Sequence, residues 1–148
     1  MTAADRVRPA SRAEFRWFAP VTTRWHDNDV FGHVNNVIYY SWIDTTVNRW
    51  LIESAALNQL NSPLIGLVAE TGCTYFESIA FPDAVETGLA ARKIGASSVE
   101  YRIGIFKAGA DKTAALGRFV HVYVDFVSRR PVALPDLMRQ KLSGLMLP

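Results

Sequence analysis

The sequence contains one cysteine, Cys73, so a disulfide within the chain is excluded. Its apolar runs fall far short of the ~18 residues that cross a bilayer, and no apolar run of signal-peptide length opens the chain. Neither charge sign dominates, because 16 basic side chains face 14 acidic ones, for a net charge of +2. We therefore expect a soluble, cytoplasmic protein with no membrane span and no nucleic-acid partner.

Motifs for common cofactors are also missing. No glycine-rich fingerprint follows a predicted strand, so neither a dinucleotide site nor a phosphate-binding loop is indicated. His26 and His33 lie near Asp27 and Asp29, which raises the question of a metal site. No further His or Cys follows at ligand spacing, so we expect neither a metal nor a bound cofactor.

The 148 residues are 49% apolar, which is enough for one domain with its own core. Residues 1–13 are polar and lack periodicity, which predicts a flexible tail before a domain at 14–148. The predicted order is a strand, a long helix, four strands and a short helix: 15–25, 34–56, 67–80, 84–94, 98–107, 113–128 and a helix from 135. Short turns between the last four strands favour hairpins, so the fold class is α+β with a five-stranded antiparallel sheet.

The helix predicted at 34–56 carries apolar residues at three- and four-residue spacing. Its expected buried stripe is Val34, Val37, Ile38, Ser41, Trp42 and Thr45. The helix is apolar almost all round, more than one sheet face requires, so we expect a second copy of the chain to cover the rest. In the last strand the expected apolar face is Val120, Val122, Val124 and Phe126, opposite His121, Tyr123 and Asp125.

The densest group of polar side chains lies at 25–36, between the first strand and the long helix. It reads WHDNDVFGHVNN and places carboxylates, imidazoles and amides within twelve residues. Such residues often only turn the chain and cap the helix. The alternative is that they form a site at the helix N-terminus.

The longer stretch HDNDVFGHVNNVIYYSWID resembles the signature of the 4-hydroxybenzoyl-CoA thioesterase family, within the hotdog-fold acyl thioesterases. The likeness rests on the Asp-x-Asp pair, on Gly32 three residues after the second acid, and on the helix aromatics Tyr39, Tyr40 and Trp42. The HVNN run is also similar to the acyl-carrier-protein thioesterase branch, and RRPVALPDLMRQKL to the usual tail of such chains. The resemblance covers about 14–143 and implies a hotdog fold, a sheet wrapped around the long helix.

The resemblance implies that Asp29, the second acid, is the catalytic carboxylate, either as a nucleophile or as a general base on water. It places Asn36 at the helix N-terminus, where the thioester oxygen is stabilised, with Asn35 and Gly32 at the substrate. The physics agrees with this, because the first turn of a helix has unpaired N–H donors and a positive dipole end.

His33 lies where the carrier-protein branch has a functional His, but Phe31 replaces the asparagine of that branch. His33 is therefore expected either to act on substrate or water or to make a hydrogen bond at the helix start. Asp27, the first acid, is expected to cap or orient the chain. Structural or peripheral roles are expected for Glu70, Asp44, His26, His121 and Cys73.

Coenzyme A would enter as part of the substrate, and its phosphates need cations. Relatives often hold the nucleotide at the turn that corresponds to 95–98. The expected contacts are Lys93, Ser97 and Ser98, with Arg92, Arg102, Arg129 and Arg130 as alternatives. Small residues stand here where some relatives have basic ones, so coenzyme A and a carrier protein both stay open.

The sequence thus predicts an acyl-CoA thioesterase that releases free acid and thiol from an acyl or aroyl thioester. A homodimer, or a homotetramer built as a dimer of dimers, is expected to share the site. The alternatives are a carrier-protein thioesterase and a hotdog module that binds acyl-CoA or lipid without hydrolysis. A hydratase is disfavoured, because no Asp/His pair of that kind follows an early strand.

Overall fold

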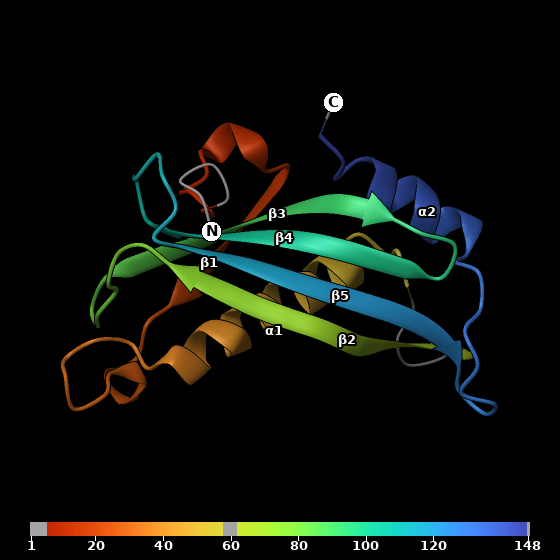
Figure 1. The fold of residues 1–148 in the computed structure, drawn as a ribbon, viewed down its shortest axis with the longest axis horizontal. Coiled ribbons are helices and arrows are strands. Elements are labelled where there is room, and N and C mark those ends of the chain that lie inside the picture. Colours follow the sequence, from red (N-terminus) through yellow and green to blue (C-terminus); the bar gives the residue numbers. More distant parts are fainter. Residues whose placement is uncertain (1–5, 58–61, 148) are drawn as a thin grey trace.

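The computed structural model describes residues 6–57 and 62–147. Within these ranges the chain forms, in order, η2 (Arg12–Glu14), β1 (Trp17–Thr22), η3 (Trp25–Asp27), α1 (Asn36–Glu53), β2 (Leu64–Tyr75), β3 (Ala84–Ile94), β4 (Ser98–Lys107), β5 (Ala115–Asp125) and α2 (Asp136–Ser143). The strands form one antiparallel sheet in the order β1-β3-β4-β5-β2 (Figure 1). The predicted α+β class and five-stranded antiparallel sheet are confirmed, and β1 and β2 are its edges. The hairpin expected between 67–80 and 84–94 is wrong, because β2 pairs with β5 and β3 pairs with β1.

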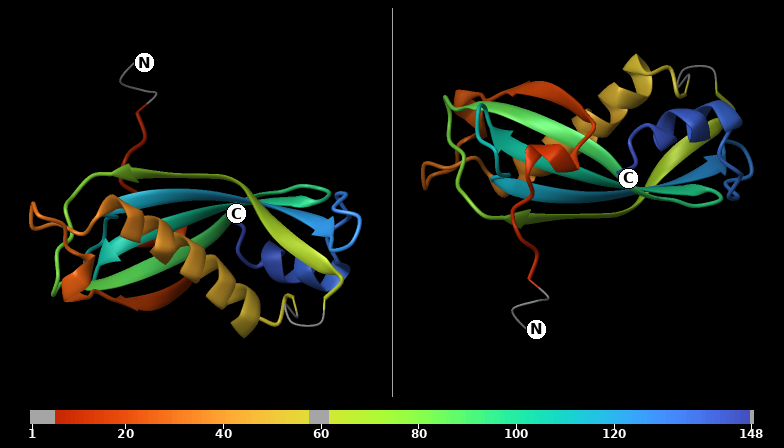
Figure 2. Two further views of the ribbon diagram at one scale, coloured as in Figure 1. Left: turned by 90° about the horizontal axis from the view of Figure 1, so that it is seen from below. Right: turned by 90° about the horizontal axis from the view of Figure 1, so that it is seen from above.

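α1 lies across one face of the sheet, as Figure 2 shows from below. Its buried residues form one stripe at three- and four-residue spacing: Tyr39, Trp42, Ile43, Thr46, Val47, Trp50 and Leu51. The predicted stripe is confirmed at Val34, Ile38 and Trp42, which lie in or against the core. It is wrong at three positions, because Val37 is 66% exposed and Ser41 and Thr45 also face outward. The observed stripe adds large apolar side chains such as Ile43 and Trp50 in place of Ser41 and Thr45, and this larger apolar burial decides which face turns inward.

The N-terminal segment covers part of the opposite face (Figure 2). Ala10 is 1% exposed, and its N–H donates to Thr113 Oγ1 over 3.0 Å. Phe15 then fills a second, smaller core on this face. The predicted tail boundary is therefore wrong for 10–13, because these residues make contacts about a hundred positions away that no local pattern announces. Residues 1–5 of that tail lie outside the described ranges.

β5 turns the face opposite to the predicted one toward α1. Phe119, His121 and Tyr123 are buried, whereas Val120 and Val122 are half-buried on the other face. Three rings under the helix bury more area than the valines would, which explains the choice. α1 lies inside the predicted 34–56, and part of the predicted connection after it, 58–61, falls outside the described ranges. Neither described helix combines the length and apolar character needed to cross a membrane.

Candidate active site

Asp27 anchors the loop between β1 and α1, and it is 1% exposed. Its Oδ1 accepts from Arg24 Nε at 2.9 Å and from Arg24 Nη2 at 2.7 Å, and its Oδ2 accepts the Arg24 backbone N–H at 2.8 Å. The Asp27 carbonyl accepts the N–H of Asn35 at 2.8 Å. Asp27 therefore ties the loop to the start of α1, and the orienting role predicted for the first acid is confirmed.

Asp29 lies in a tight turn that follows this anchor. Its N–H donates to the carbonyl of His33 at 2.8 Å, and its Oδ1 accepts the N–H of Phe31, also at 2.8 Å. Gly32 has a φ of +82°, a left-handed conformation that side chains disfavour. The turn thus fixes Oδ1 with a backbone donor. No hydrogen bond from the described residues engages Oδ2.

Asn35 is the N-cap of α1. Its Oδ1 accepts the N–H of Val37 at 3.0 Å, and its carbonyl accepts the N–H of Ile38 at 2.9 Å. The N–H of Asn36, the first helical residue, has no acceptor among the described residues. A free donor at the positive end of a helix is suited to hold an oxyanion.

A pocket of about 440 Å³ opens at this end of α1. It is lined by Asp29, His33, Val34, Asn36, Tyr39, Tyr75, Phe76, Glu77 and Ser78. The structure thus brings the three predicted catalytic residues, Asp29, His33 and Asn36, to one cavity. We call it the Asp29 pocket, and its size falls in the range of about 300–1,000 Å³ that is usual for small-molecule sites.

Tyr75, at the end of β2, is a site residue that the sequence did not predict. Its hydroxyl donates to Asn36 Oδ1 over 2.8 Å, which directs the amide Nδ2 away from Tyr75. Burial raises the pKa of Tyr75 far above its ordinary value, so the hydroxyl keeps the proton that it donates. Tyr39 packs edge-on against Tyr75, with ring centroids 4.9 Å apart, and forms the aromatic wall of the pocket.

A second hollow, of about 910 Å³, lies on the other side of Asp29. It contains Gly32 and Asn35, the predicted substrate-binding residues of this loop, together with exposed apolar side chains. Among these, Val30 is 94% exposed and Phe31 is 81% exposed. The carboxylate therefore borders both hollows, and an apolar rim of this kind is typical of surfaces that contact other molecules.

The Asp29 pocket is poor in cations. Its other charged side chain, Glu77, pairs with Lys107 at 2.9 Å, and no Lys or Arg belongs to its lining. Among the described residues, no three His, Cys, Asp or Glu side chains are grouped to hold a metal ion. Burial raises the pKa of the Cys73 thiol, so this residue is not an activated nucleophile. Asp29 is therefore the one carboxylate in the lining of this pocket without an ion-pair partner among the described residues.

The predicted nucleotide contacts Lys93, Ser97 and Ser98 lie elsewhere. The β3–β4 hairpin that carries them is at the end of the sheet beside α2, far from the loop before α1 (Figure 1). Arg139 of α2 holds two carbonyls of this hairpin, at 2.9 and 3.3 Å. A single chain does not bring these residues to Asp29, and their contact with coenzyme A stays a prediction.

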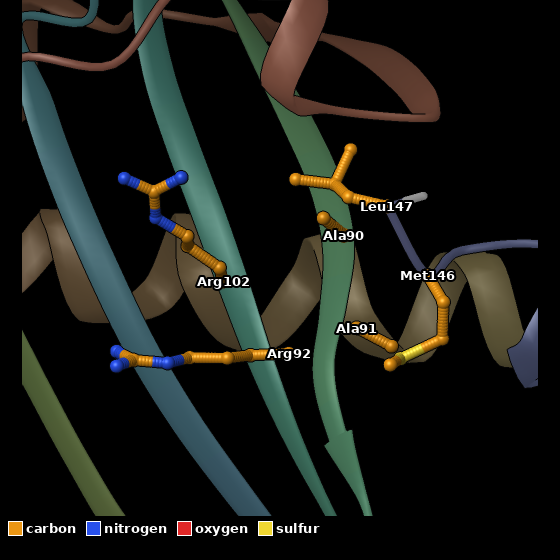
Figure 3. Close-up of a pocket in the computed structure, with 6 residues that line it drawn as sticks. All are labelled: Ala90, Ala91, Arg92, Arg102, Met146 and Leu147. Atoms are coloured by element: carbon orange, nitrogen blue, oxygen red, sulfur yellow. The ribbon is translucent and has the colours of Figure 1, made fainter.

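Arg92 and Arg102 border a pocket of about 420 Å³ on the face of the sheet opposite α1 (Figure 3). It is lined by Ala90, Ala91, Arg92, Arg102, Met146 and Leu147. Arg102 already pairs with Glu14 at 2.9 Å, and Arg92 Nε lies 3.6 Å from a carboxylate oxygen of Glu100. The sheet separates these guanidinium groups from the Asp29 pocket.

Two other acidic residues have the peripheral positions predicted for them. Glu70 pairs with Arg118 on the outer face of the sheet. Asp44 lies on the exposed side of α1, where its Oδ1 accepts from Asn48 Nδ2 at 3.2 Å. His121, expected to be exposed or satisfied, is instead 4% exposed, and its Nδ1 has no partner within the described residues. Its burial follows from the inverted face of β5.

A five-stranded antiparallel sheet wrapped over one long helix, with a carboxylate at the N-terminus of that helix, defines a hotdog-fold protein. A sequence profile of the thioesterase-like superfamily matches residues 23–142. The chain belongs to the thioesterase-like superfamily, and the predicted hotdog fold is confirmed. No similarity to a curated protein was found.

Solved structures agree with this assignment. The PA5185 protein from Pseudomonas aeruginosa strain PAO1 is 45% identical, with a TM-score of 0.90 over 94% of this chain and 97% of that one. A 1,4-dihydroxy-2-naphthoyl-CoA thioesterase from Synechocystis, Slr0204, has the same fold at 16% identity, with a TM-score of 0.78 over 86% and 96% of the two chains. The gentisyl-coenzyme A thioesterase BH1999 is 20% identical, with a TM-score of 0.75 over 85% and 99%.

Proposed function

We propose that the protein hydrolyses an acyl or aroyl thioester of coenzyme A in the Asp29 pocket. The observation that carries this proposal is the coincidence, in one cavity, of the Asp29 carboxylate and the free N–H of Asn36. Thioester cleavage passes through an oxyanion, which needs preorganised donors, and through attack by water or a carboxylate. Coenzyme A takes part only as a portion of the substrate.

The thioester oxygen accepts the N–H of Asn36, and the Asn36 amide, held by Tyr75, offers Nδ2 beside it. Asp29 acts in one of two ways. As a base it removes a proton from the water whose oxygen bonds to the carbonyl carbon. The C–S bond then breaks, and the leaving thiolate takes that proton from Asp29, which gives acid and thiol. As a nucleophile it forms an acyl-enzyme anhydride with loss of thiolate, and water then cleaves the anhydride.

The lining supports an apolar or aromatic acyl group. Tyr39, Tyr75 and Phe76 supply rings, and such side chains usually bind the apolar part of a ligand. Two structural relatives are named as thioesterases of aroyl-CoA substrates, which is consistent with membership of the narrower 4-hydroxybenzoyl-CoA thioesterase family. Because no Lys or Arg lines the pocket, the phosphates of coenzyme A would lie outside it.

The test is thiol release by the purified protein from short, long, branched and aromatic acyl-CoA substrates. Asp29→Asn keeps the acceptor for the Phe31 N–H but removes the charge, and we expect it to lower kcat by about 10²-fold or more. Asp44→Asn makes the same chemical change on the exposed side of α1 and serves as the control, with turnover unchanged. Full turnover in Asp29→Asn would contradict the assignment.

The same screen separates the alternatives. Tight binding of acyl-CoA without thiol release would identify a non-hydrolytic binding module. Faster release from an acyl-carrier protein than from coenzyme A carrying the same acyl group would identify a carrier-protein thioesterase. The carboxylate next to a free backbone donor favours hydrolysis, because a binding module has no need of either group.

We also propose that the working unit is a dimer formed along β2, or a dimer of such dimers. β2 is an edge strand of 12 residues, and on it Leu67 and Val68 are 42% and 51% exposed. β1, the other edge, carries Pro20, which blocks strand pairing. Tyr75 lies on β2 and lines the Asp29 pocket, so a partner on this edge would complete the pocket wall.

A lysine on each edge tests the dimer. Val68→Lys is expected to shift the mass measured by light scattering from dimer toward monomer and to lower thiol release, because an edge lysine opposes strand pairing. Thr22→Lys, on the exposed β1 edge, is the matched control and should change neither. A wild-type protein that is monomeric and fully active would contradict the proposal.

A further inference from the structure

A separate cavity of about 220 Å³ lies at the other end of α1, between this helix, β2 and β5. We call it the His121 pocket, and its lining is Asn48, Leu51, Leu57, Leu64, Ile65, Gly66, His121 and Tyr123. It shares no residue with the Asp29 pocket. Along the helix, Asn48 lies about 18 Å from Asn36 at a rise of about 1.5 Å per residue. A molecule in this pocket is therefore separate from the thioester at Asp29.

The pocket contains a buried polar atom without a partner. His121 is 4% exposed, and its Nδ1 makes no hydrogen bond within the described residues. The ring centroid of Tyr123 lies 5.7 Å from that of His121, and the Tyr123 hydroxyl faces the hydroxyl of Tyr101. Proteins satisfy nearly all buried polar atoms, because an unsatisfied one keeps its full desolvation cost. An unpaired, buried imidazole nitrogen that lines a cavity points to a ligand that supplies the missing hydrogen bond.

The uncharged lining of the His121 pocket favours an uncharged ligand. No Asp, Glu, Lys or Arg belongs to the lining. Burial lowers the pKa of His121 to about 4 and raises that of Tyr123 to about 12, so both groups are neutral at pH 7. A charged ligand would enter without a counter-ion, which is costly. A hydroxyl suits the site, because it can donate to or accept from either form of the imidazole nitrogen.

The volume of the His121 pocket limits the size of the ligand. The remaining lining is aliphatic and favours an apolar body: Leu51, Leu57, Leu64 and Ile65. A cavity of about 150 Å³ accepts benzene in another protein, so this volume fits one aromatic ring with a substituent. Gly66 keeps the space open, since a Cβ there would lie 3.3 Å from His121 Nδ1 and 3.2 Å from Tyr123 Cε1. A larger side chain at this position would occupy the place in front of the imidazole.

We propose that the His121 pocket is a second ligand site, which binds an uncharged molecule of about one ring that carries a hydroxyl, with the hydroxyl bonded to His121 Nδ1. The site is distinct from the proposed active site and does not depend on its chemistry. Phenol is the simplest probe of this class. Benzene lacks the hydroxyl, and benzoate adds a charge, so the three compounds test each element of the proposal.

The experiment is a titration of the protein with phenol, followed by the ring-proton NMR signals of its three histidines. His121→Phe identifies the His121 signals, since His26 and His33 are exposed. We expect phenol to shift the His121 signals in a saturable manner. Benzene should bind about fivefold more weakly or worse, because one buried hydrogen bond is lost. Benzoate should not bind.

Three variants test whether phenol binds in the His121 pocket. Gly66→Val is expected to abolish phenol binding, whereas Gly72→Val, on the same strand with nothing within 4 Å of its Cβ position, should leave it intact. Binding of phenol and benzene to His121→Phe is followed by the ring-proton signals of the ligand, because this variant lacks the His121 signals. The variant should remove the preference for phenol over benzene even if Gly66→Val fails to fold. Equal affinities for phenol and benzene in the wild type would overturn the proposal. So would shifts confined to His26 and His33, or phenol binding that survives Gly66→Val.

Discussion

The two ends of α1 carry opposite kinds of cavity. At its N-terminus, exposed polar side chains and a free backbone N–H surround the Asp29 pocket, and a short loop sets their positions. Toward its C-terminus, buried rings and aliphatic side chains enclose a neutral imidazole. The first arrangement follows from helix geometry, which leaves unpaired donors at every N-terminus. The second follows from packing, because only the inward face of β5 places His121 there.

The difference has a consequence for stability. Groups at the N-terminal end already contact water, so substitutions there should alter the chemistry of the site and leave the free energy of unfolding nearly unchanged. Groups at the other end are desolvated, so substitutions or protonation there should change the free energy of unfolding. Activity and stability therefore report on different ends of one helix.

The largest effect on activity is expected when the backbone N–H of Asn36 is removed. Asn36→Pro removes the N–H, and the helix tolerates it because proline suits the first helical position. The preceding residue, Asn35, has φ −60° and ψ 139°, an extended conformation that fits a residue before proline. We expect kcat for thiol release to fall by about 10²–10³-fold, or about 3 kcal/mol of transition-state stabilisation.

Asn36→Ala is the matched control, because it removes the side chain and keeps the N–H. It should lose far less activity than Asn36→Pro, and circular dichroism should show the same helix content in both. Equal rates for the two variants would mean that the side chain, and not the backbone, holds the thioester oxygen.

The next prediction concerns His121, near the C-terminal end of α1. Its titration should change the free energy of unfolding by about 3 kcal/mol between pH 6.5 and pH 4. His121 stays neutral in the folded chain down to about pH 4, whereas in the unfolded chain it gains its proton near pH 6.5. Between these values the unfolded state binds more protons, so the free energy of unfolding falls as the pH is lowered from 6.5 to 4. Above pH 6.5 the group is neutral in both states and has no effect on this dependence.

Urea unfolding of the wild type and of His121→Phe across this pH range provides the measurement. Other acids also titrate, so the difference between the two proteins isolates His121. That difference should shrink or change sign as the pH falls, since only the wild type loses stability through His121. Parallel curves would show that His121 is hydrated or paired in solution.

The sequence predicted the N-terminal end of α1 well because its determinants are contiguous. The turn at Asp29, the cap at Asn35 and the donor at Asn36 all lie within eight residues, and their geometry depends on local hydrogen bonds. The order of strands and helices was also predictable, because turn residues and apolar periodicity mark each element. Such signals need no knowledge of distant parts of the chain.

The predictions that were wrong for α1 and β5 share one cause. Each depended on which face of a helix or strand packs inward. On α1 the predicted stripe was right at Trp42 but wrong at Ser41 and Thr45, because Ile43 and Trp50 turn inward instead. On β5 the alternation of valines pointed to the wrong face, and His121 was therefore misjudged. Tyr75 was missed for a related reason, since its place beside Asn36 depends on how β2 lies against the helix, not on spacing along the chain.

The smallest expected effect on activity distinguishes the Asn36 side-chain amide from the Asn36 backbone N–H. Tyr75→Phe removes the hydroxyl that holds Asn36 Oδ1 and keeps the aromatic wall against Tyr39. One neutral hydrogen bond contributes about 1 kcal/mol, so kcat should fall about fivefold, with KM nearly unchanged because the ring remains.

Tyr40→Phe, which alters a half-buried tyrosine outside both cavities, is the control and should leave both constants unchanged. A fall as large as that of Asn36→Pro would move the main oxyanion donor from the helix backbone to the Asn36 amide. No change would confine Tyr75 to packing.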